Sequence, residues 1–185
     1  MSDINTMTRQ KQTVKLAKMG MLVAISIVLV AFIHFPIIPA VPFMEYDPAD
    51  IPILIGAFAF GPAAGLALTA VTALIQGVTV SAGSGIYGII MHLVATGALV
   101  ATASIIYSRH KTRKGAIIAV IAGTLAMAAV MVPCNLIVTP IFMGAPRSAV
   151  VALIPAIIAF NLVKAGINSA VTFLLYKKIS GFLHK

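Results

Sequence analysis

Long apolar segments, separated by short polar stretches, make up almost the whole chain after its first 13 residues. Most of them run for about twenty residues, the length that an α-helix needs to cross the apolar core of a bilayer. The pattern predicts an all-α membrane protein, a single membrane domain over residues 1–185 with a polar N-terminal segment at residues 1–13. The predicted helices cover residues 14–33, 48–60, 62–80, 86–108, 115–139 and 149–176.

The second predicted helix is shorter than the others. It follows an apolar loop that holds three prolines between residues 34 and 47, a density that resists regular helix. Asp47 can cap the helix, Pro48 suits its first position, and Gly61-Pro62 ends it. About 13 residues span roughly 20 Å, less than a bilayer core of about 30 Å. We therefore expect a compact bundle of six transmembrane helices, with neighbouring protein or a cavity covering the ends of the second one and the outer loop folded down over a site.

Composition supports a membrane protein and excludes several other classes. Hydrophobic residues make up 61% of the chain, which has 13 Lys or Arg and 4 Asp or Glu. A soluble domain is nearer half apolar and one quarter charged, and disordered chains are poor in Ile, Leu and Val. Cys134 is the only cysteine, so the chain can form neither an internal disulfide nor a metal site built from cysteines.

The net charge of +9 follows from topology, and no nucleic-acid partner is expected. With six spans, eleven of the thirteen basic residues fall on one side of the membrane, before the first helix, between the fourth and fifth, and after the sixth. The positive-inside rule makes that side cytoplasmic. We therefore expect a multi-pass protein of the cell membrane with both termini in the cytoplasm. Three of its four acids, Glu45, Asp47 and Asp50, then lie on the outer side.

A cluster of polar residues lies within the sixth predicted helix. Asn161, Lys164 and Asn168 are three and four residues apart, so they share one helical face. Polar groups at membrane depth are costly and often functional. No predicted span carries an acid near its middle, so the Lys164 ammonium is expected to find amides, carbonyls, water or a ligand. Contact with a ligand is favoured over a lysine that only packs against carbonyls.

Two further polar residues lie within predicted spans. Asn135 follows Pro133, which frees a carbonyl one turn earlier for an asparagine or a ligand. A structural hydrogen bond between helices explains Asn135 equally well. His92 alone is more often a satisfied core histidine than a ligand-binding one, and no second His or Cys lies near it at metal spacing. No metal is therefore expected.

Aromatic residues near the predicted outer face form either an interfacial belt or a stacking wall for a flat ligand. These are Phe35, Phe43, Tyr46 and Tyr87. The chain has no Gly-rich loop followed by Lys and Ser or Thr, no paired acids within the spans and no Ser/His/Asp arrangement. We therefore expect a protein that binds a molecule within the membrane, and neither an enzyme nor a protein that needs a cofactor.

Three stretches carry a resemblance to a known family. Residues 34–65 are similar to its first loop and second helix, Asn135 with residues 136–140 to its fifth helix, and Asn161-x-x-Lys164 to a motif in its sixth helix. The family is that of the substrate-binding S components of energy-coupling factor (ECF) vitamin transporters, and the chain most closely resembles the riboflavin-specific S component. The likeness extends over about residues 15–178.

The resemblance implies the substrate-binding subunit of an ATP-driven vitamin importer. Residues that correspond to Asn135, Asn161 and Lys164 hydrogen-bond the flavin in that family, and the first loop covers the site. The family has no ATPase of its own and docks onto a shared transmembrane coupling subunit with two cytoplasmic ATPase subunits. Gly20 and Ala24, small residues four apart that let another helix approach closely, would form the docking face.

The same resemblance gives the remaining candidates a role. Phe43, Met44 and Tyr46 could supply an apolar slot for the flat flavin ring, with Tyr87 near it. His92 stands where the family usually has Asn, and this departure bears on the cargo. Riboflavin is the expected cargo, and binding of FMN is left open. The alternatives are an S component for another vitamin or precursor, or an autonomous small-molecule carrier.

Overall fold

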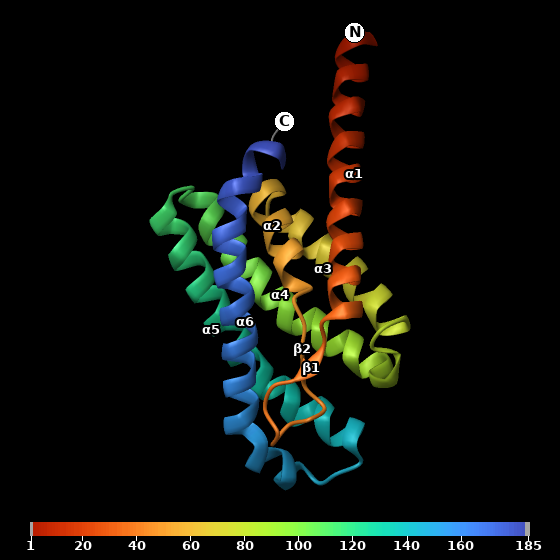
Figure 1. Cartoon of the computed structure of the whole chain (residues 1–185), viewed down its shortest axis with the longest axis vertical. Helices are drawn as coiled ribbons and strands as arrows, with labels where there is room; N and C mark the ends of the chain where they lie inside the picture. Colours follow the sequence, from red (N-terminus) through yellow and green to blue (C-terminus); the bar gives the residue numbers. More distant parts are fainter. Residues whose placement is uncertain (1, 184–185) are drawn as a thin grey trace.

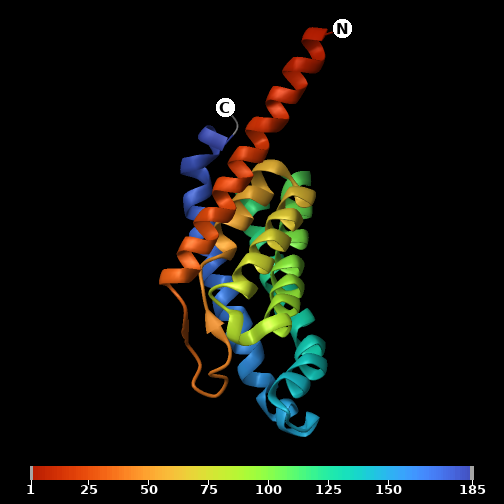
Figure 2. The same cartoon turned by 90° about the vertical axis from the view of Figure 1, so that its right-hand side faces the viewer.

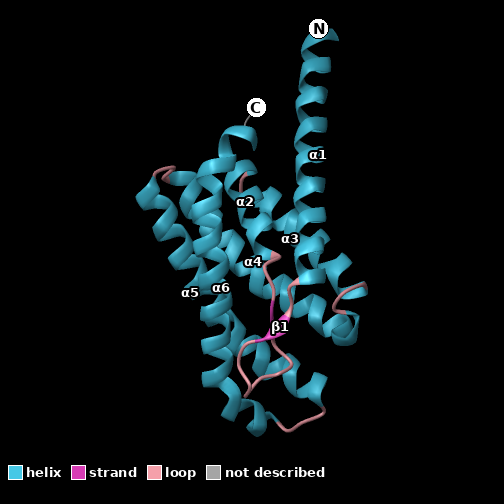
Figure 3. Cartoon of the chain, in the orientation of Figure 1, coloured by secondary structure: helices cyan, strands magenta, loops and turns pink. Residues whose placement is uncertain are grey.

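The computed structural model describes residues 2–183, which form six α-helices joined by short connections (Figure 1 and Figure 3). A two-stranded ladder lies between the first two helices, and a 3-10 turn precedes the fourth. The predicted all-α bundle of six helices with a short second helix is confirmed. In chain order the elements are α1 (Ser2–Phe32), β1 (Phe35–Pro36), β2 (Glu45–Tyr46), α2 (Asp50–Phe60), α3 (Pro62–Val78), η1 (Ala82–Ser84), α4 (Gly85–Arg109), α5 (Arg113–Met143) and α6 (Arg147–Leu183).

Four stretches of the described residues are long and apolar enough to cross a membrane: 9–32, 82–109, 113–143 and 147–179. The helices α2 and α3 have 11 and 17 residues. Both are therefore shorter than a bilayer core of about 30 Å. The two ends of the chain and the α4–α5 connection lie at one end of the bundle. The β1–β2 ladder, η1 and the α5–α6 connection lie at the other end (Figure 1 and Figure 2).

Several helices extend beyond their predicted bounds. The helix α1 begins at Ser2, so residues 2–13, predicted as a polar segment outside the first helix, are helical. This segment contains neither Gly nor Pro, so nothing in it interrupts the helix. The helix α5 begins after Thr112, whose hydroxyl accepts a hydrogen bond from the Gly115 N–H, and it continues through Pro133 to Met143.

The helix α2 begins two residues later than predicted. The Oδ1 of Asp47 accepts a hydrogen bond from the backbone N–H of Ala49 at 3.0 Å. Ala49 itself already has helical backbone angles, so Asp47 stabilises the turn before the helix and does not cap the helix directly. The helix ends at Phe60 as predicted, because Gly61 adopts a φ of 91° that other residues rarely reach, and Pro62 then begins α3.

The short helix α2 is the centre of the bundle. All of its residues from Asp50 to Phe58 are buried, and α1, α3, α4 and α6 pack around it. The crossing with α3 is close: a Cβ on Gly65 would lie 2.5 Å from the Cβ of Ala57. Neighbouring protein therefore surrounds the helix that is too short to span a bilayer, as its length predicted.

The loop of residues 33–49, called the cap loop below, folds onto the bundle as its apolar composition predicted. Its two arms pair as the antiparallel strands β1 and β2, with Phe35 opposite Tyr46. Its tip carries Val41, which is fully buried. The residues of α6 in the same apolar cluster are Val150, Ile157 and Phe160.

Candidate functional site

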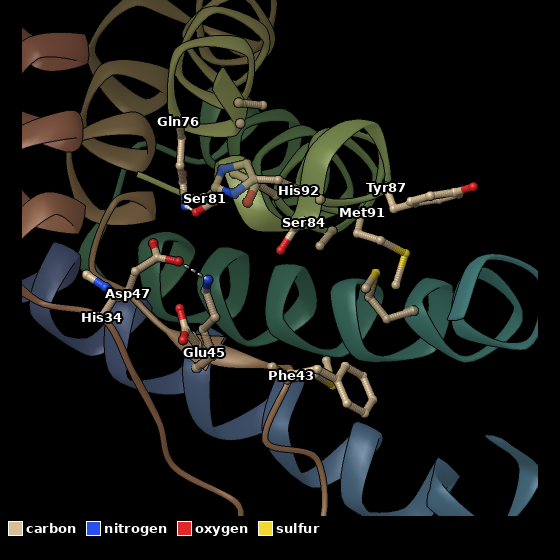
Figure 4. Close-up of a pocket in the computed structure, with 18 of the residues that line it drawn as sticks. His34, Phe43, Glu45, Asp47, Gln76, Ser81, Ser84, Tyr87, Met91 and His92 are labelled. Carbon is tan, nitrogen blue, oxygen red and sulfur yellow. Dashed lines mark hydrogen bonds and ion pairs between the residues drawn. The ribbon is translucent and has the colours of Figure 1, made fainter. Parts of the chain in front are cut away.

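A cavity of about 440 Å³ lies beneath the cap loop, between it and the helices α3, α4, α5 and α6 (Figure 4). This volume is within the range of sites that bind small organic molecules. Seven of the eight residues predicted from the sequence to contact a ligand line this cavity: Phe43, Met44, Tyr87, His92, Asn135, Asn161 and Lys164.

Tyr46 is the one predicted contact residue that does not line the cavity. Its side chain is buried, and its hydroxyl donates a hydrogen bond to Asn168 Oδ1 at 3.1 Å. The Phe35 ring lies beside it, with 5.6 Å between the ring centroids. In this structure, Tyr46 therefore joins the loop to α6 and forms no wall of a ligand slot.

Lys164 has an acidic partner, which corrects the expectation that it would find none. Its Nζ donates a hydrogen bond to Asp47 Oδ2 at 2.6 Å, and both side chains are buried. Burial is the largest single effect and acts to raise the pKa of the Asp47 carboxyl, but the Lys164 ammonium, together with the hydrogen bonds that Asp47 accepts and the nearby His92, holds that pKa below its usual range. The sequence pattern missed this pair because Asp47 belongs to a loop. Its only signal was the apolar composition of that loop, which predicts burial.

A second layer of hydrogen bonds holds the base of the cap loop. Asn168, on α6, donates from its Nδ2 to the Asp47 carbonyl at 3.0 Å and to Asp50 Oδ2 at 3.1 Å. The other oxygen of Asp50 accepts a hydrogen bond from the Thr96 hydroxyl at 2.7 Å. Asp50 and Thr96 were not predicted as part of the site. Asn168 thus binds the backbone of the cap loop and the first turn of α2. It does not line the cavity.

His92 lies between this layer and the cavity. Its Nε2 is 3.9 Å from Asp50 Oδ1, too far for a hydrogen bond, and the atom is buried with no hydrogen-bond partner. The two groups would form an ion pair only if the imidazole were protonated. Within residues 9–179, whose side chains the structure describes, no three His, Cys, Asp or Glu side chains lie close enough together to hold a metal ion.

The amides of Asn135 and Asn161 are only partly used inside the protein. Asn135 donates from Nδ2 to the Met131 carbonyl and accepts at Oδ1 from the Thr139 hydroxyl, each at 2.8 Å. Asn135 therefore does not bind the carbonyl that Pro133 frees one turn earlier, which the sequence offered as one possible partner. Asn161 donates from Nδ2 to the Ile157 carbonyl at 2.8 Å. Since an amide nitrogen has two hydrogens and its oxygen two lone pairs, both residues keep capacity for a ligand.

The two predicted docking residues lie on the exposed surface of α1. Gly20 and Ala24 are both exposed, and a Cβ added to Gly20 would meet no atom within 4 Å. The fold of this chain therefore does not require a small residue at position 20.

Known proteins provide an independent comparison. Residues 14–176 match the family described as ECF transporter, substrate-specific component. The chain is 30% identical to the riboflavin transporter RibU of Staphylococcus aureus, over 95% of both chains. It is 25% identical to the riboflavin transporter FmnP of Bacillus subtilis, over 92% of this chain and 94% of the relative.

A solved structure agrees with these sequence relatives. The S component of a bacterial ECF transporter superposes with a TM-score of 0.82 at 31% identity, and the match covers 94% of this chain and 99% of the other. The bundle, the cap loop and the cavity beneath it thus occur in a chain whose sequence matches one family over most of its length. The protein belongs to the substrate-specific components, or S components, of the ECF transporters.

Proposed function

We propose that this protein is the riboflavin-binding S component of an ATP-driven vitamin importer, which takes up its cargo from the outside. The observation that carries the proposal is the cavity of about 440 Å³ with Asn161 and Lys164 in its wall. The proposal is supported by relatives named as riboflavin transporters, which align with more than nine tenths of this chain.

The chemistry of the cavity wall suits a flavin ring. Phe43, Met44, Met91 and Tyr87 provide apolar and aromatic surface for a flat tricycle. The imide edge of a flavin offers one N–H donor between two carbonyl acceptors. An ammonium has three donors, and Asp47 takes one of them, so Lys164 can pair with Asp47 and donate to a flavin carbonyl at the same time.

The amides complement the same edge of the ring. Asn161 directs its Nδ2 to its own helix, which leaves its Oδ1 to accept from the imide N–H. Asn135 retains one N–H of its Nδ2 for a second ring acceptor. With these contacts, the polar edge of the proposed flavin ring lies against α5 and α6.

The visible spectrum of the purified protein tests this function. The full chain, purified from cells grown in rich medium, should carry a yellow chromophore that absorbs in the blue. After removal of the chromophore, added riboflavin should lose its fluorescence on binding with a stoichiometry near one. A protein that purifies colourless and leaves riboflavin fluorescence unchanged would contradict the proposal.

Transport requires partners in this proposal. We expect a transmembrane coupling subunit and two cytoplasmic ATPase subunits, with α1 docking through Gly20 and Ala24. The excess of basic residues on one side favours cytoplasmic termini. A reporter fused after Lys185 should therefore be cytoplasmic, and an extracellular reporter would refute this orientation. Uptake that persists in cells lacking the ATPase subunits would identify an autonomous carrier instead.

A further inference from the structure

One end of the cavity is markedly more polar than the other. Figure 4 shows Gln76, Ser81 and His92 together at one end, whereas Tyr87 and Met91 lie toward the other. Gln76 is on α3 and His92 on α4, so helices that do not carry the Asn161–Lys164 motif add polar groups at the end of the cavity where Asp47 pairs with Lys164 (Figure 4). The function proposed above assigns no role to Gln76.

Two buried polar atoms at this end lack partners inside the protein. The Oε1 of Gln76 and the Nε2 of His92 make no hydrogen bond, and both residues line the cavity. The Nε2 of Gln76 donates to the Ser81 hydroxyl at 3.3 Å, a long hydrogen bond, and Ser81 lines the cavity as well. A buried polar atom without a partner is costly, so these groups are suited to a ligand that supplies hydrogen bonds.

The charges around this end restrict what that ligand carries. Glu45 lines the cavity, and Asp50 lies behind His92. Among the described residues that line the cavity, Lys164 is the only Lys or Arg, and it is already paired with Asp47. An anionic group such as a phosphate would therefore meet carboxylates without a free cation. Amide, imidazole and serine hydroxyl groups instead match neutral hydroxyls, which both donate and accept.

We propose that Gln76 is a specificity-determining residue that recognises the hydroxyl-bearing tail of the ligand. The inference rests on the proposed function: with the ring between the apolar wall and the α5 and α6 amides, the tail extends to Gln76, Ser81 and His92. The site then selects a flavin with a neutral polyol tail over the bare ring and over a phosphorylated tail.

Three flavins and one substitution test this assignment. Riboflavin carries the polyol tail, lumiflavin replaces it with a methyl group, and FMN adds a phosphate to it. The full-length protein in detergent should bind riboflavin more tightly than either of the other two. Gln76→Met keeps an unbranched side chain of similar length but removes the amide. It should reduce the ratio of riboflavin to lumiflavin affinity by about three- to tenfold, the value of one hydrogen bond.

The controls separate failure of this inference from failure of the proposed function. Gln12→Met, on the exposed part of α1, should leave the affinity ratio unchanged. Unchanged lumiflavin affinity in Gln76→Met shows that the variant is folded, and an unchanged ratio then overturns the role of Gln76. If Gln76→Met binds neither flavin, Gln76→Asn, which keeps an amide but shortens its reach, replaces it, and an unchanged ratio in that variant overturns the proposal equally. A parent protein that binds no flavin would refute the function itself.

Discussion

Loss of either member of the Lys164–Asp47 pair should destabilise the protein more than loss of both. The Nζ–Oδ2 distance is 2.6 Å, and the two side chains are exposed by only 9% and 6%. A charge left unpaired in such surroundings costs about 3–5 kcal/mol. Replacing both residues by neutral ones removes that cost, so the double variant should recover much of the lost stability.

A double-mutant cycle measures the interaction. The variants are Asp47→Asn, Lys164→Met and their combination, each compared with the parent by thermal unfolding in detergent without ligand. A chain of this size shifts its unfolding temperature by about 2–4 °C per kcal/mol, so each single change should lower it by roughly 10 °C. The double variant should be more stable than the sum of the single effects by at least about 2 kcal/mol.

The same variants test the role of Lys164 in binding. A hydrogen bond with a charged donor is worth about 1.5–3 kcal/mol, so Lys164→Met should weaken riboflavin binding roughly 10- to 100-fold. Lys111→Met, at an exposed position, is the matched control and should change neither stability nor binding. Purely additive single effects would refute the proposed ion pair. Unchanged affinity in a folded Lys164→Met variant would make Lys164 a structural residue only.

Three further substitutions and one change of pH distinguish binding, stability and docking. Asn168→Leu should lower the unfolding temperature by removing its hydrogen bonds to Asp47 and Asp50, whereas Asn161→Leu should mainly weaken riboflavin binding; the reverse pattern would contradict the site assignment. Folding lowers the pKa of Asp47, so the ionised carboxylate stabilises the folded protein. This stabilisation is fully present above the pKa of Asp47 in the unfolded chain, about 4, and is lost as the pH falls through the pKa in the folded protein. The difference in unfolding temperature between the parent and Asp47→Asn should therefore shrink below about pH 4, and a constant difference would count against the shift. Gly20→Leu should impair uptake and spare riboflavin binding, since the added side chain begins in open space; full uptake would exclude this docking face.

The helices were predictable from the sequence because each depends on local information. Apolar segments of membrane length, with Pro and Gly at their ends, defined the order of the six helices and the brevity of α2. The end of α2 at Gly61 followed from the chemistry of one dipeptide. The extension of α1 to Ser2 could not be predicted from the sequence, because a polar segment that lacks Gly and Pro is compatible with either helix or coil.

The partners of the buried polar groups could not be predicted in the same way. That Lys164 meets Asp47 depends on how deeply a loop 117 residues earlier in the chain folds into the bundle. The apolar residues of that loop indicated burial, but they carried no information on which helix the carboxylate would face. Tyr46 illustrates the same limit, because its ring could face the cavity or α6, and only the pairing of β1 with β2 decides between them.

The enclosed position of α2 has a consequence for the response to lipid. Its residues from Asp50 to Phe58 are all buried, so this helix presents almost no surface to the acyl chains. A thicker or thinner bilayer is accommodated by tilt or by local deformation around the helices that do face it, such as α1. The first turn of α2, with Asp50 beneath the cavity, is thereby shielded from mismatch strain. Ligand affinity should vary little between short-chain and long-chain phospholipids, and a sensitivity of transport to membrane thickness should arise at the lipid-facing helices.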